Sequence, residues 1–151
     1  MPDELVELLD TAIYKEIASQ AFYIAGQRKT QDRGAKILMK ELAEEELKHT
    51  QLLKDIKEMG LNEHSWQRNE VPNLRISEYL TGGETLEGAS LQDTFVFAMK
   101  RERQSIEFYS RLMSVMRDEA AKHMCERLVH EELRHKLRLE IFYDGFFYGE
   151  D

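Results

Sequence analysis

The chain has 151 residues, of which 42% are apolar and 33% are charged, a composition typical of one globular domain with a single core. A formal net charge of −8 disfavours nonspecific binding to nucleic acid or anionic lipid, and no run of about 18 apolar residues predicts a membrane span. The single cysteine excludes an internal disulfide, and the acidic start does not resemble a signal peptide. We therefore expect one domain over residues 1–151, in a cytoplasmic protein without nucleic-acid or membrane partners.

Helical periodicity predicts four long helices. Only two prolines and eight glycines interrupt the chain, which also favours long helices over a β fold. Gly60 and Gly145 are placed as stops after the second and fourth helices, and the segment from Ser90 to Asp93 resembles a capping box. The expected ranges are Asp3–Arg28, Asp32–Met59, Ser90–Arg117 and Asp118–Tyr143.

The lengths of the connections predict how these helices pair. The first two and the last two helices have short connections, so each pair is expected to form an antiparallel hairpin. Residues 61–89 form a long segment between the hairpins, with one further short helix expected near Ile76–Leu80. The predicted fold is an all-α four-helix bundle with one long crossover between its second and third helices.

The second hairpin repeats the first. A shift of 86 residues, without a gap, places Glu16 on Glu102, Phe22-Tyr23 on Phe108-Tyr109, Glu45-Glu46 on Glu131-Glu132, and His49 on His135. A single register kept over two helices indicates two copies of one hairpin, related by a pseudo-two-fold axis.

Polar residues lie inside the apolar stripes of all four helices. Glu16 and Glu102 are each at the centre of a predicted buried face, and His49 and His135 lie near the middle of two others. A buried carboxylate without compensation costs several kcal/mol, and no lysine or arginine lies on these stripes. Divalent cations are the expected compensation, because carboxylates and imidazoles suit iron, manganese or zinc.

Each histidine follows a pair of glutamates. A glutamate three residues before a histidine is its neighbour on the helix surface, so that both side chains can reach one metal ion. A glutamate four residues before the histidine satisfies helical geometry equally well. Periodicity therefore leaves the choice open between Glu45 and Glu46, and between Glu131 and Glu132.

The pattern resembles the ferritin-like di-iron carboxylate superfamily, and most of all its rubrerythrin type. The resemblance covers the four helices but not the crossover, and it implies a ferritin-like bundle that binds two iron ions per chain, with manganese or zinc as alternatives. The motifs that carry it are Glu16 with Phe22-Tyr23, Glu46-Leu47-Lys48-His49, Glu102 with Phe108-Tyr109, and Glu132-Leu133-Arg134-His135.

The resemblance also implies roles for single residues. It selects the glutamate three residues before each histidine, and it leaves Glu45 and Glu131 at the rim of the site. It further implies that Tyr23 and Tyr109 hydrogen-bond the carboxylates. The implied ligands are Glu16 and His49 for one metal, Glu102 and His135 for the other, and Glu46 and Glu132 as bridges between them.

Two departures from the family bear on function. Rubrerythrins usually carry a further ligand glutamate three residues after the third-helix glutamate, and here that position is Ser105. The remaining four glutamates and two histidines are closer to the number of metal ligands in bacterioferritin or manganese catalase. A chain with one cysteine also lacks the family's rubredoxin-like module, so an external electron donor, such as a rubredoxin-like protein, is expected.

The favoured interpretation is an oxidoreductase that reacts with hydrogen peroxide or O₂, of the peroxidase or ferroxidase type, with a dimanganese catalase left open. One alternative is a non-enzymatic iron-binding and buffering protein, and another is a metal-free helical interaction module. A homo-oligomer, in particular a dimer, is expected. The aromatic segment from Ile141 to Tyr148 is interpreted as a cap of the bundle or as a subunit interface.

Overall fold

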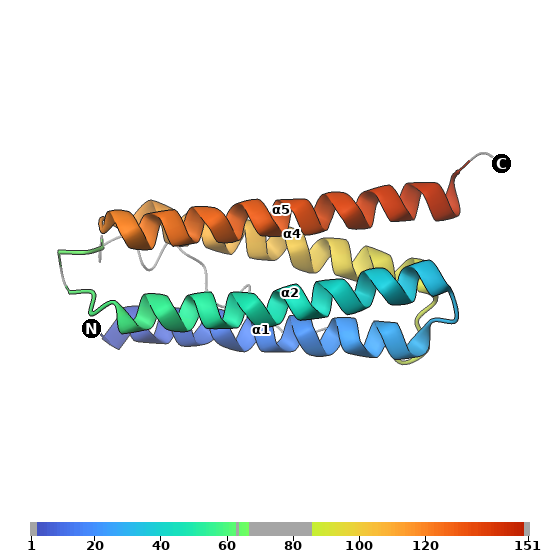
Figure 1. Cartoon of the computed structure of the whole chain (residues 1–151), viewed down its shortest axis with the longest axis horizontal. Coiled ribbons are helices and arrows are strands. Elements are labelled where there is room, and N and C mark those ends of the chain that lie inside the picture. Colours follow the sequence, from blue (N-terminus) through green and yellow to red (C-terminus); the bar gives the residue numbers. More distant parts are fainter. Residues whose placement is uncertain (1–2, 63, 67–85, 150–151) are drawn as a thin grey trace.

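The computed structural model describes residues 3–62, 64–66 and 86–149. Its helices are α1 (Asp3–Lys29), α2 (Arg33–Glu58), α4 (Leu91–Val115) and α5 (Glu119–Phe147), and they lie side by side along one axis (Figure 1). Within the described ranges there is no β-strand beyond an isolated bridge between Trp66 and Met116. The predicted all-α bundle is confirmed, while the short helix expected near Ile76–Leu80 lies outside the described residues.

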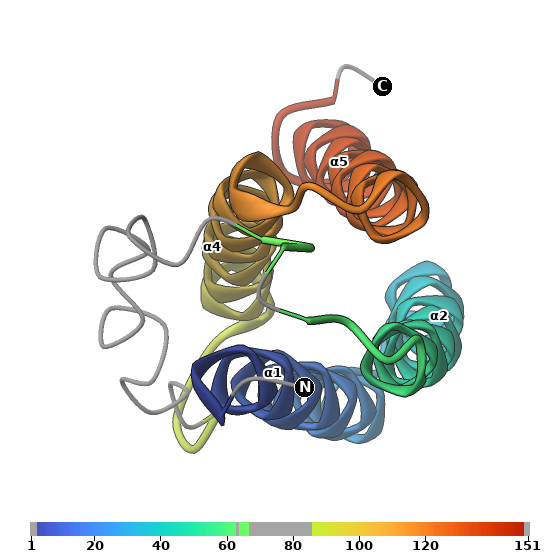
Figure 2. The ribbon, with the colours of Figure 1, turned by 90° about the vertical axis from the view of Figure 1, so that its left-hand side faces the viewer.

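The helices form the two predicted hairpins. In the view along the bundle, α1 lies beside α2 and α4 beside α5, and the hairpins face each other so that α1 is next to α4 and α2 next to α5 (Figure 2). The bundle therefore has two sides between the hairpins, here named the α1–α4 side and the α2–α5 side.

Side-chain caps explain where three of the helices begin. Asp32 and Asp118 precede α2 and α5, and each carboxylate accepts a hydrogen bond from the backbone N–H three residues later, at 2.8 and 2.9 Å. The predicted capping box is present before α4, where Asp93 donates its backbone N–H to Ser90 Oγ at 3.0 Å. These local contacts satisfy N–H groups that have no partner inside the helix.

The last helix differs from the prediction. It continues past the expected end at Tyr143, and Gly145 lies inside it instead of stopping it. Phe142 stacks on Phe95 of α4 with ring centroids 4.8 Å apart, and Phe146 stacks on Phe142 at 5.6 Å. This aromatic packing outweighs the cost of about 1 kcal/mol that a glycine imposes inside a helix.

Two apolar clusters fill the bundle, one toward each end. One contains Leu9, Ala12, Leu53, Leu112 and Leu128 among others, and the second contains Leu38, Leu42, Phe95, Ala98 and Leu139 among others. Most residues of the predicted apolar stripes belong to these clusters. The polar stripe residues lie between the two clusters, so apolar side chains bound the polar layer on both sides along the axis.

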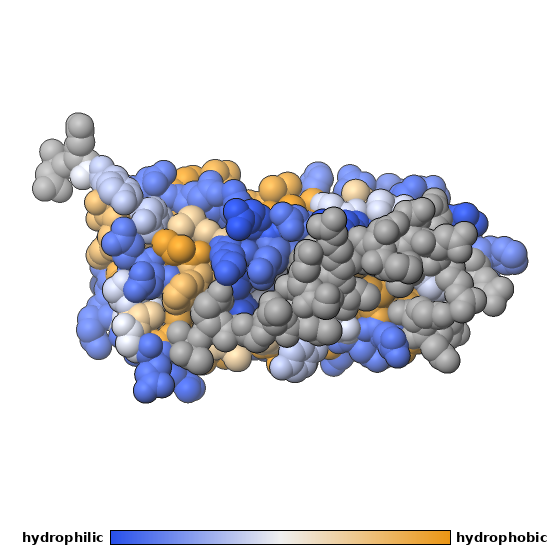
Figure 3. Space-filling model, turned by 180° about the vertical axis from the view of Figure 1, so that it is seen from behind, coloured by the Kyte–Doolittle hydropathy of each residue, from blue (hydrophilic) through white to orange (hydrophobic). Residues whose placement is uncertain are grey.

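On the face seen in Figure 3, hydrophilic residues cover much of the described surface, and apolar atoms are exposed near the end of the bundle where α5 finishes. Ile141, Phe146 and Tyr148 in that region are 63%, 48% and 68% exposed. The aromatic segment thus packs partly onto the bundle, and its use as a subunit interface stays a prediction. None of the described helices combines the length and apolar character needed to cross a bilayer.

Two glycines provide a matched test of this helical frame. Gly145 lies within α5 and Gly60 follows α2 with φ of 71°, and an added methyl group at either position would meet no neighbouring atom within 4 Å. Gly145→Ala should raise the free energy of unfolding by about 0.5–1 kcal/mol, because alanine loses less entropy in a helix. Gly60→Ala should lower it by about 1 kcal/mol, because alanine is strained at positive φ. Chemical denaturation measures both, and equal effects would contradict the assigned backbone conformations.

Candidate metal centre

The polar layer brings together the six residues that the sequence singled out. Each helix contributes to it, α1 and α4 with one glutamate each, and α2 and α5 with a glutamate and a histidine each. All six side chains are at most 2% exposed; they are Glu16, Glu46, His49, Glu102, Glu132 and His135. The two apolar clusters on either side of the layer are formed by the same four helices, and their packing holds these six side chains in place.

These residues form two overlapping groups that are each compact enough to hold a metal ion. In each group the candidate ligand atoms lie within 4.8 Å of one another. Glu46 and Glu132 belong to both groups. The first group adds Glu16 and His49 to them, and the second adds Glu102 and His135. Two ion positions that share two carboxylates therefore fit the arrangement.

The inner nitrogen of each histidine faces the carboxylates. His49 Nδ1 lies 2.8 Å from Glu132 Oε1, 3.5 Å from Glu16 Oε2 and 3.8 Å from Glu46 Oε2. Because the three oxygens come from three different helices, the imidazole stands at the point where the hairpins meet.

His135 has the equivalent surroundings in the other half. Its Nδ1 lies 3.0 Å from Glu46 Oε1, 3.5 Å from Glu132 Oε1 and 3.7 Å from Glu102 Oε1. The two imidazole rings are stacked, with centroids 5.5 Å apart and planes at 15°. Each of the shared glutamates therefore lies close to both histidines.

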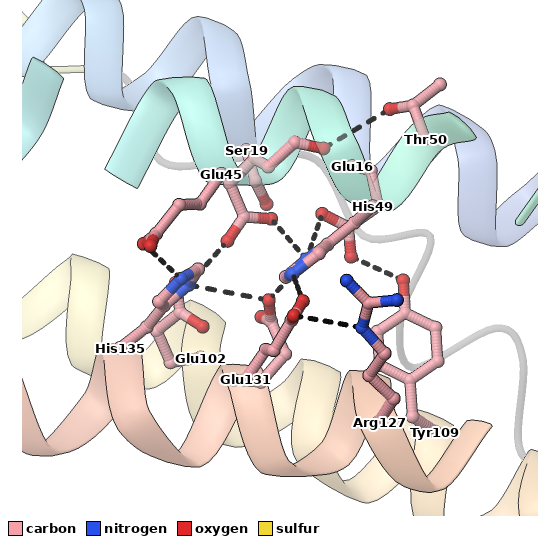
Figure 4. Close-up of polar contacts among 12 residues, drawn as sticks. Glu16, Ser19, Glu45, His49, Thr50, Glu102, Tyr109, Arg127, Glu131 and His135 are labelled. Atoms are coloured by element: carbon pink, nitrogen blue, oxygen red, sulfur yellow. Dashed lines mark hydrogen bonds and ion pairs between the residues drawn. The ribbon is translucent and has the colours of Figure 1, made fainter. Parts of the chain in front are cut away.

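The outer nitrogen of each histidine meets one of the neighbouring glutamates from the opposite hairpin. His49 Nε2 is 2.5 Å from Glu131 Oε2, and His135 Nε2 is 2.7 Å from Glu45 Oε2 (Figure 4). Glu45 and Glu131 are about one-third and one-quarter exposed, whereas the glutamates that follow them are buried. The fold therefore separates the members of each pair: one faces the centre, and one holds a histidine from outside.

Two buried tyrosines contact the terminal carboxylates. Tyr23 on α1 donates its hydroxyl to Glu102 Oε1 on α4 at 2.5 Å, and Tyr109 on α4 donates to Glu16 on α1. Each tyrosine therefore binds the glutamate of the other hairpin and not the one on its own helix. Burial, together with the neighbouring carboxylate charges, raises the pKa of both tyrosines well above 10, so they remain hydrogen-bond donors.

The four central carboxylates titrate differently because they repel one another. Burial and the charges of neighbouring glutamates raise the pKa of Glu46 and of Glu132 well above the usual range. Burial also favours the neutral forms of Glu16 and Glu102, but hydrogen bonds from neighbouring carboxyl groups and from histidine outweigh it and lower their pKa. Without metal, protons on the shared glutamates therefore reduce the charge of the layer.

His49 is held in its protonated form in the same way. Burial opposes its charge, but hydrogen bonds with Glu131 and Glu16 raise its pKa to about 11. The hydrogen bond from His49 in turn lowers the pKa of Glu131 to about 2. A metal ion at Nδ1 would have to replace this proton, so metal binding is coupled to proton release.

The unsatisfied atoms of the layer show whether metal ions fit it. Glu16 Oε2, Glu46 Oε2, Glu102 Oε2, both oxygens of Glu132 and His49 Nδ1 are buried and make no hydrogen bond of normal geometry among the described residues, although His49 Nδ1 and Glu132 Oε1 lie 2.8 Å apart as an ion pair. Buried polar atoms are normally satisfied, and each of these is a metal-ligand atom. The donor set therefore fits iron, manganese or zinc.

The sequence analysis missed two basic residues beside the centre. Lys15 and Arg101 directly precede Glu16 and Glu102, and they occupy equivalent positions in the repeat. Arg101 donates to Ser19 Oγ at 3.3 Å and lies 5.1 Å from the centre of the Phe22 ring. Neither residue lies on an apolar stripe. The signal in the sequence is that a basic residue directly precedes the terminal glutamate in both copies of the repeat.

The α2–α5 side carries a pocket of about 390 Å³ that reaches both histidines. The lining includes His49 and His135 with their outer partners Glu131 and Glu45, and the basic residue Arg127. Arg127 Nε donates to Glu131 Oε1 at 3.2 Å. This pocket therefore brings solvent behind the histidines, and the outer glutamates stand between solvent and the imidazoles.

The comparisons with known proteins agree with this architecture. The sequence matches the rubrerythrin family model over residues 7–143. The structure resembles a hypothetical protein from Pyrococcus furiosus with a TM-score of 0.70 and 24% identity, covering 96% of this chain and 91% of that one. It also resembles a two-domain protein from Anabaena variabilis that contains DJ-1/ThiJ/PfpI-like and ferritin-like domains, with a TM-score of 0.71 and 18% identity, covering 96% of this chain and 40% of that one. The search of curated proteins gave no match.

The pKa shifts of the buried layer predict how the stability of the protein depends on pH when metal is removed with a chelator. The raised pKa values of Glu46, Glu132 and His49 mean that, above pH 5, the folded state binds more protons than the unfolded state. The free energy of unfolding should therefore fall as pH rises from 5 to 9, by about 1.4 kcal/mol per pH unit for each extra proton. Denaturant titrations across this range measure the slope, and a stability that rises over the same range would contradict the assignment.

Proposed function

The chain belongs to the rubrerythrin family, and from this premise we propose that it is a two-metal oxidoreductase that reduces hydrogen peroxide or O₂. The observation that carries the proposal is the set of buried, unsatisfied ligand atoms in two groups that share two glutamates. A metal-free interaction module would leave the cost of burying these atoms without compensation.

The proposed ligand sets follow the two groups. Glu16 and His49 would hold one ion, Glu102 and His135 would hold the other, and Glu46 and Glu132, which belong to both groups, would serve both ions. Iron is the preferred metal because the family and the donor set both suit it, and manganese is the alternative. When bound, two ferrous ions supply the two electrons that convert hydrogen peroxide and two protons into two molecules of water.

The residues around the centre have separate tasks in this reaction. Tyr23 and Tyr109 hold the terminal glutamates by hydrogen bonds, and Glu131 and Glu45 hold the outer nitrogens of the histidines. The apolar clusters on either side keep water from the polar layer along the bundle axis. The carboxylates and imidazoles are thereby fixed before any ion binds, which lowers the cost of assembling the site.

The 151 residues contain one cysteine, Cys125, which is buried, and a single cysteine does not form an iron–thiolate centre. We therefore propose an external electron donor, such as a rubredoxin-like protein, and a homodimer as the working assembly. Turnover of peroxide by iron-loaded protein with an artificial reductant tests the activity. Two bound irons with no turnover would support iron buffering instead, and catalase activity of the manganese form would support that chemistry.

Removing one terminal ligand tests the metal assignment. Glu102→Ala should lower metal content from about two ions per chain to about one, because a single group would remain complete. The matched control is Glu107→Ala, since Glu107 is exposed on the same helix. Elemental analysis after incubation with ferrous ion measures both variants. Wild-type occupancy in Glu102→Ala would refute the ligand assignment, and no metal in the unaltered protein would refute the proposed function.

Removing an outer glutamate tests its support of a histidine. Glu131→Ala should weaken metal affinity about 10- to 100-fold without lowering the number of ions at saturation, because His49 loses the carboxylate that orients it. Glu126→Ala is the matched control, as Glu126 is exposed on the same helix. Competition with a chromophoric chelator measures the affinities. Equal affinities for the two variants would mean that the contact with His49 has no role in binding.

A further inference from the structure

The outward side of α5 carries a row of exposed apolar side chains. Leu133, Leu137 and Ile141 are spaced four residues apart and are 48%, 55% and 63% exposed. The helix packs on α4 and α2 with its other side, and none of the described helices lies against its outward side (Figure 2). Single exposed apolar residues are ordinary on a protein surface, whereas a row of three on one side of a helix marks a contact surface.

Polar residues extend this row symmetrically at both ends. Glu126 and His130 lie eleven and seven residues before Leu137, Asp144 and Tyr148 lie seven and eleven residues after it, and all four are exposed. At about 100° per residue, these residues and the apolar row share one arc of about 80° on the helix surface. Each of them therefore has a counterpart at the same distance on the other side of Leu137. This surface is here named the outer α5 face; it consists of Glu126, His130, Leu133, Leu137, Ile141, Asp144 and Tyr148.

The symmetry makes the outer α5 face complementary to a second copy of itself in antiparallel orientation. With a two-fold axis at Leu137, each residue of the face would meet its counterpart in the other copy. Leu137 would pack on Leu137 and Leu133 on Ile141, so that apolar side chains cover each other. In the two outer pairs a carboxylate would meet a hydrogen-bond donor; these pairs are Asp144 with His130 and Glu126 with Tyr148.

The charges on and beside the face favour the antiparallel arrangement. In a parallel pair Glu126 would meet Glu126 and Asp144 would meet Asp144, which places like charges together. Arg134 lies about 20° beyond the arc and would stay at the solvated rim. Three other basic residues beside the face already have acidic partners in the same chain: Arg127 with Glu131, Lys136 with Glu140, and Arg138 with Glu41. An antiparallel contact therefore covers the apolar row without burying a charge that lacks a partner.

We propose that the outer α5 face is the surface through which two copies of this chain form an antiparallel, two-fold symmetric dimer. The inference names the contact surface of the homodimer in the proposed function and rests on that part of it, whereas the metal chemistry does not enter. One pair of helices is smaller than a standard protein interface, so the dissociation constant of the dimer is expected to be on the order of micromolar.

A charge at the centre of the face tests the contact. Sedimentation equilibrium of the purified protein measures the dissociation constant of the dimer. Leu137→Asp should raise this constant about 100-fold, because two carboxylates would meet at the two-fold axis in place of two leucines. Ile37→Asp is the matched control, since Ile37 is 51% exposed on α2 and lies outside the face, and it should leave the constant unchanged. Circular dichroism checks that both variants keep their helices.

Disulfide formation tests the antiparallel pairing independently. Leu133→Cys and Ile141→Cys are mixed, with one of them isotopically labelled, and a mild oxidant accepts the two hydrogens that the thiols lose. A disulfide between the two variants is expected, because the proposed pairing brings these positions within reach of each other. Each variant oxidised alone should form little disulfide. Cys125 does not compete because it is buried.

The outcomes separate this inference from the metal chemistry. A dimer that Leu137→Asp leaves as stable as Ile37→Asp does would refute only this surface, and disulfides within each cysteine variant but not between the two would refute the antiparallel pairing. A protein that binds two metals and stays monomeric would refute the inference and the homodimer, and leave the metal site standing. A dimer that Leu137→Asp dissociates, in a protein that binds no metal, would support the inference and refute the proposed oxidoreductase.

Discussion

Repulsion among four buried carboxylates is the constraint on which the rest of this structure depends. Glu16, Glu46, Glu102 and Glu132 lie in one layer of the bundle, and all are almost fully buried. The apolar clusters on both sides hold the helices close enough to keep these groups together despite their mutual repulsion. The fold thereby maintains a buried layer whose oxygens lack hydrogen bonds of normal geometry among the described residues and which could hold metal ions.

The duplicated hairpin satisfies this constraint through contacts that cross between its two copies. Tyr23 donates to Glu102 and Tyr109 to Glu16, while Glu131 and Glu45 contact the histidines of the opposite hairpin. Neither hairpin contains a whole candidate group by itself, because each group draws on residues of both hairpins. The candidate centre therefore forms only where the two hairpins dock against each other.

The polar layer has different neighbours on the two sides of the bundle. On the α2–α5 side the pocket is lined by Glu45 and Glu131, by Arg127, which pairs with Glu131, and by the basic residues Lys48 and Arg134. On the α1–α4 side Arg101 reaches over the terminal glutamates toward Ser19. The layer therefore has imidazoles supported by carboxylates on one side and the guanidinium of Arg101, bound to a buried serine, on the other.

The sequence by itself determined the four helices, the capping box at Ser90, and the positions of Glu16, His49, Glu102 and His135 inside apolar stripes, because periodicity places a side chain on one face of its own helix. It could not choose between Glu45 and Glu46 by geometry, since both lie near the middle of one stripe. Only the tertiary structure decided that Glu46 faces the centre while Glu45 contacts His135, and that each tyrosine binds the glutamate of the other hairpin. It also extended α5 through Gly145, because stacking between Phe142 and Phe95 is a contact between helices. Periodicity describes one helix at a time, whereas these contacts depend on the register in which two helices pack.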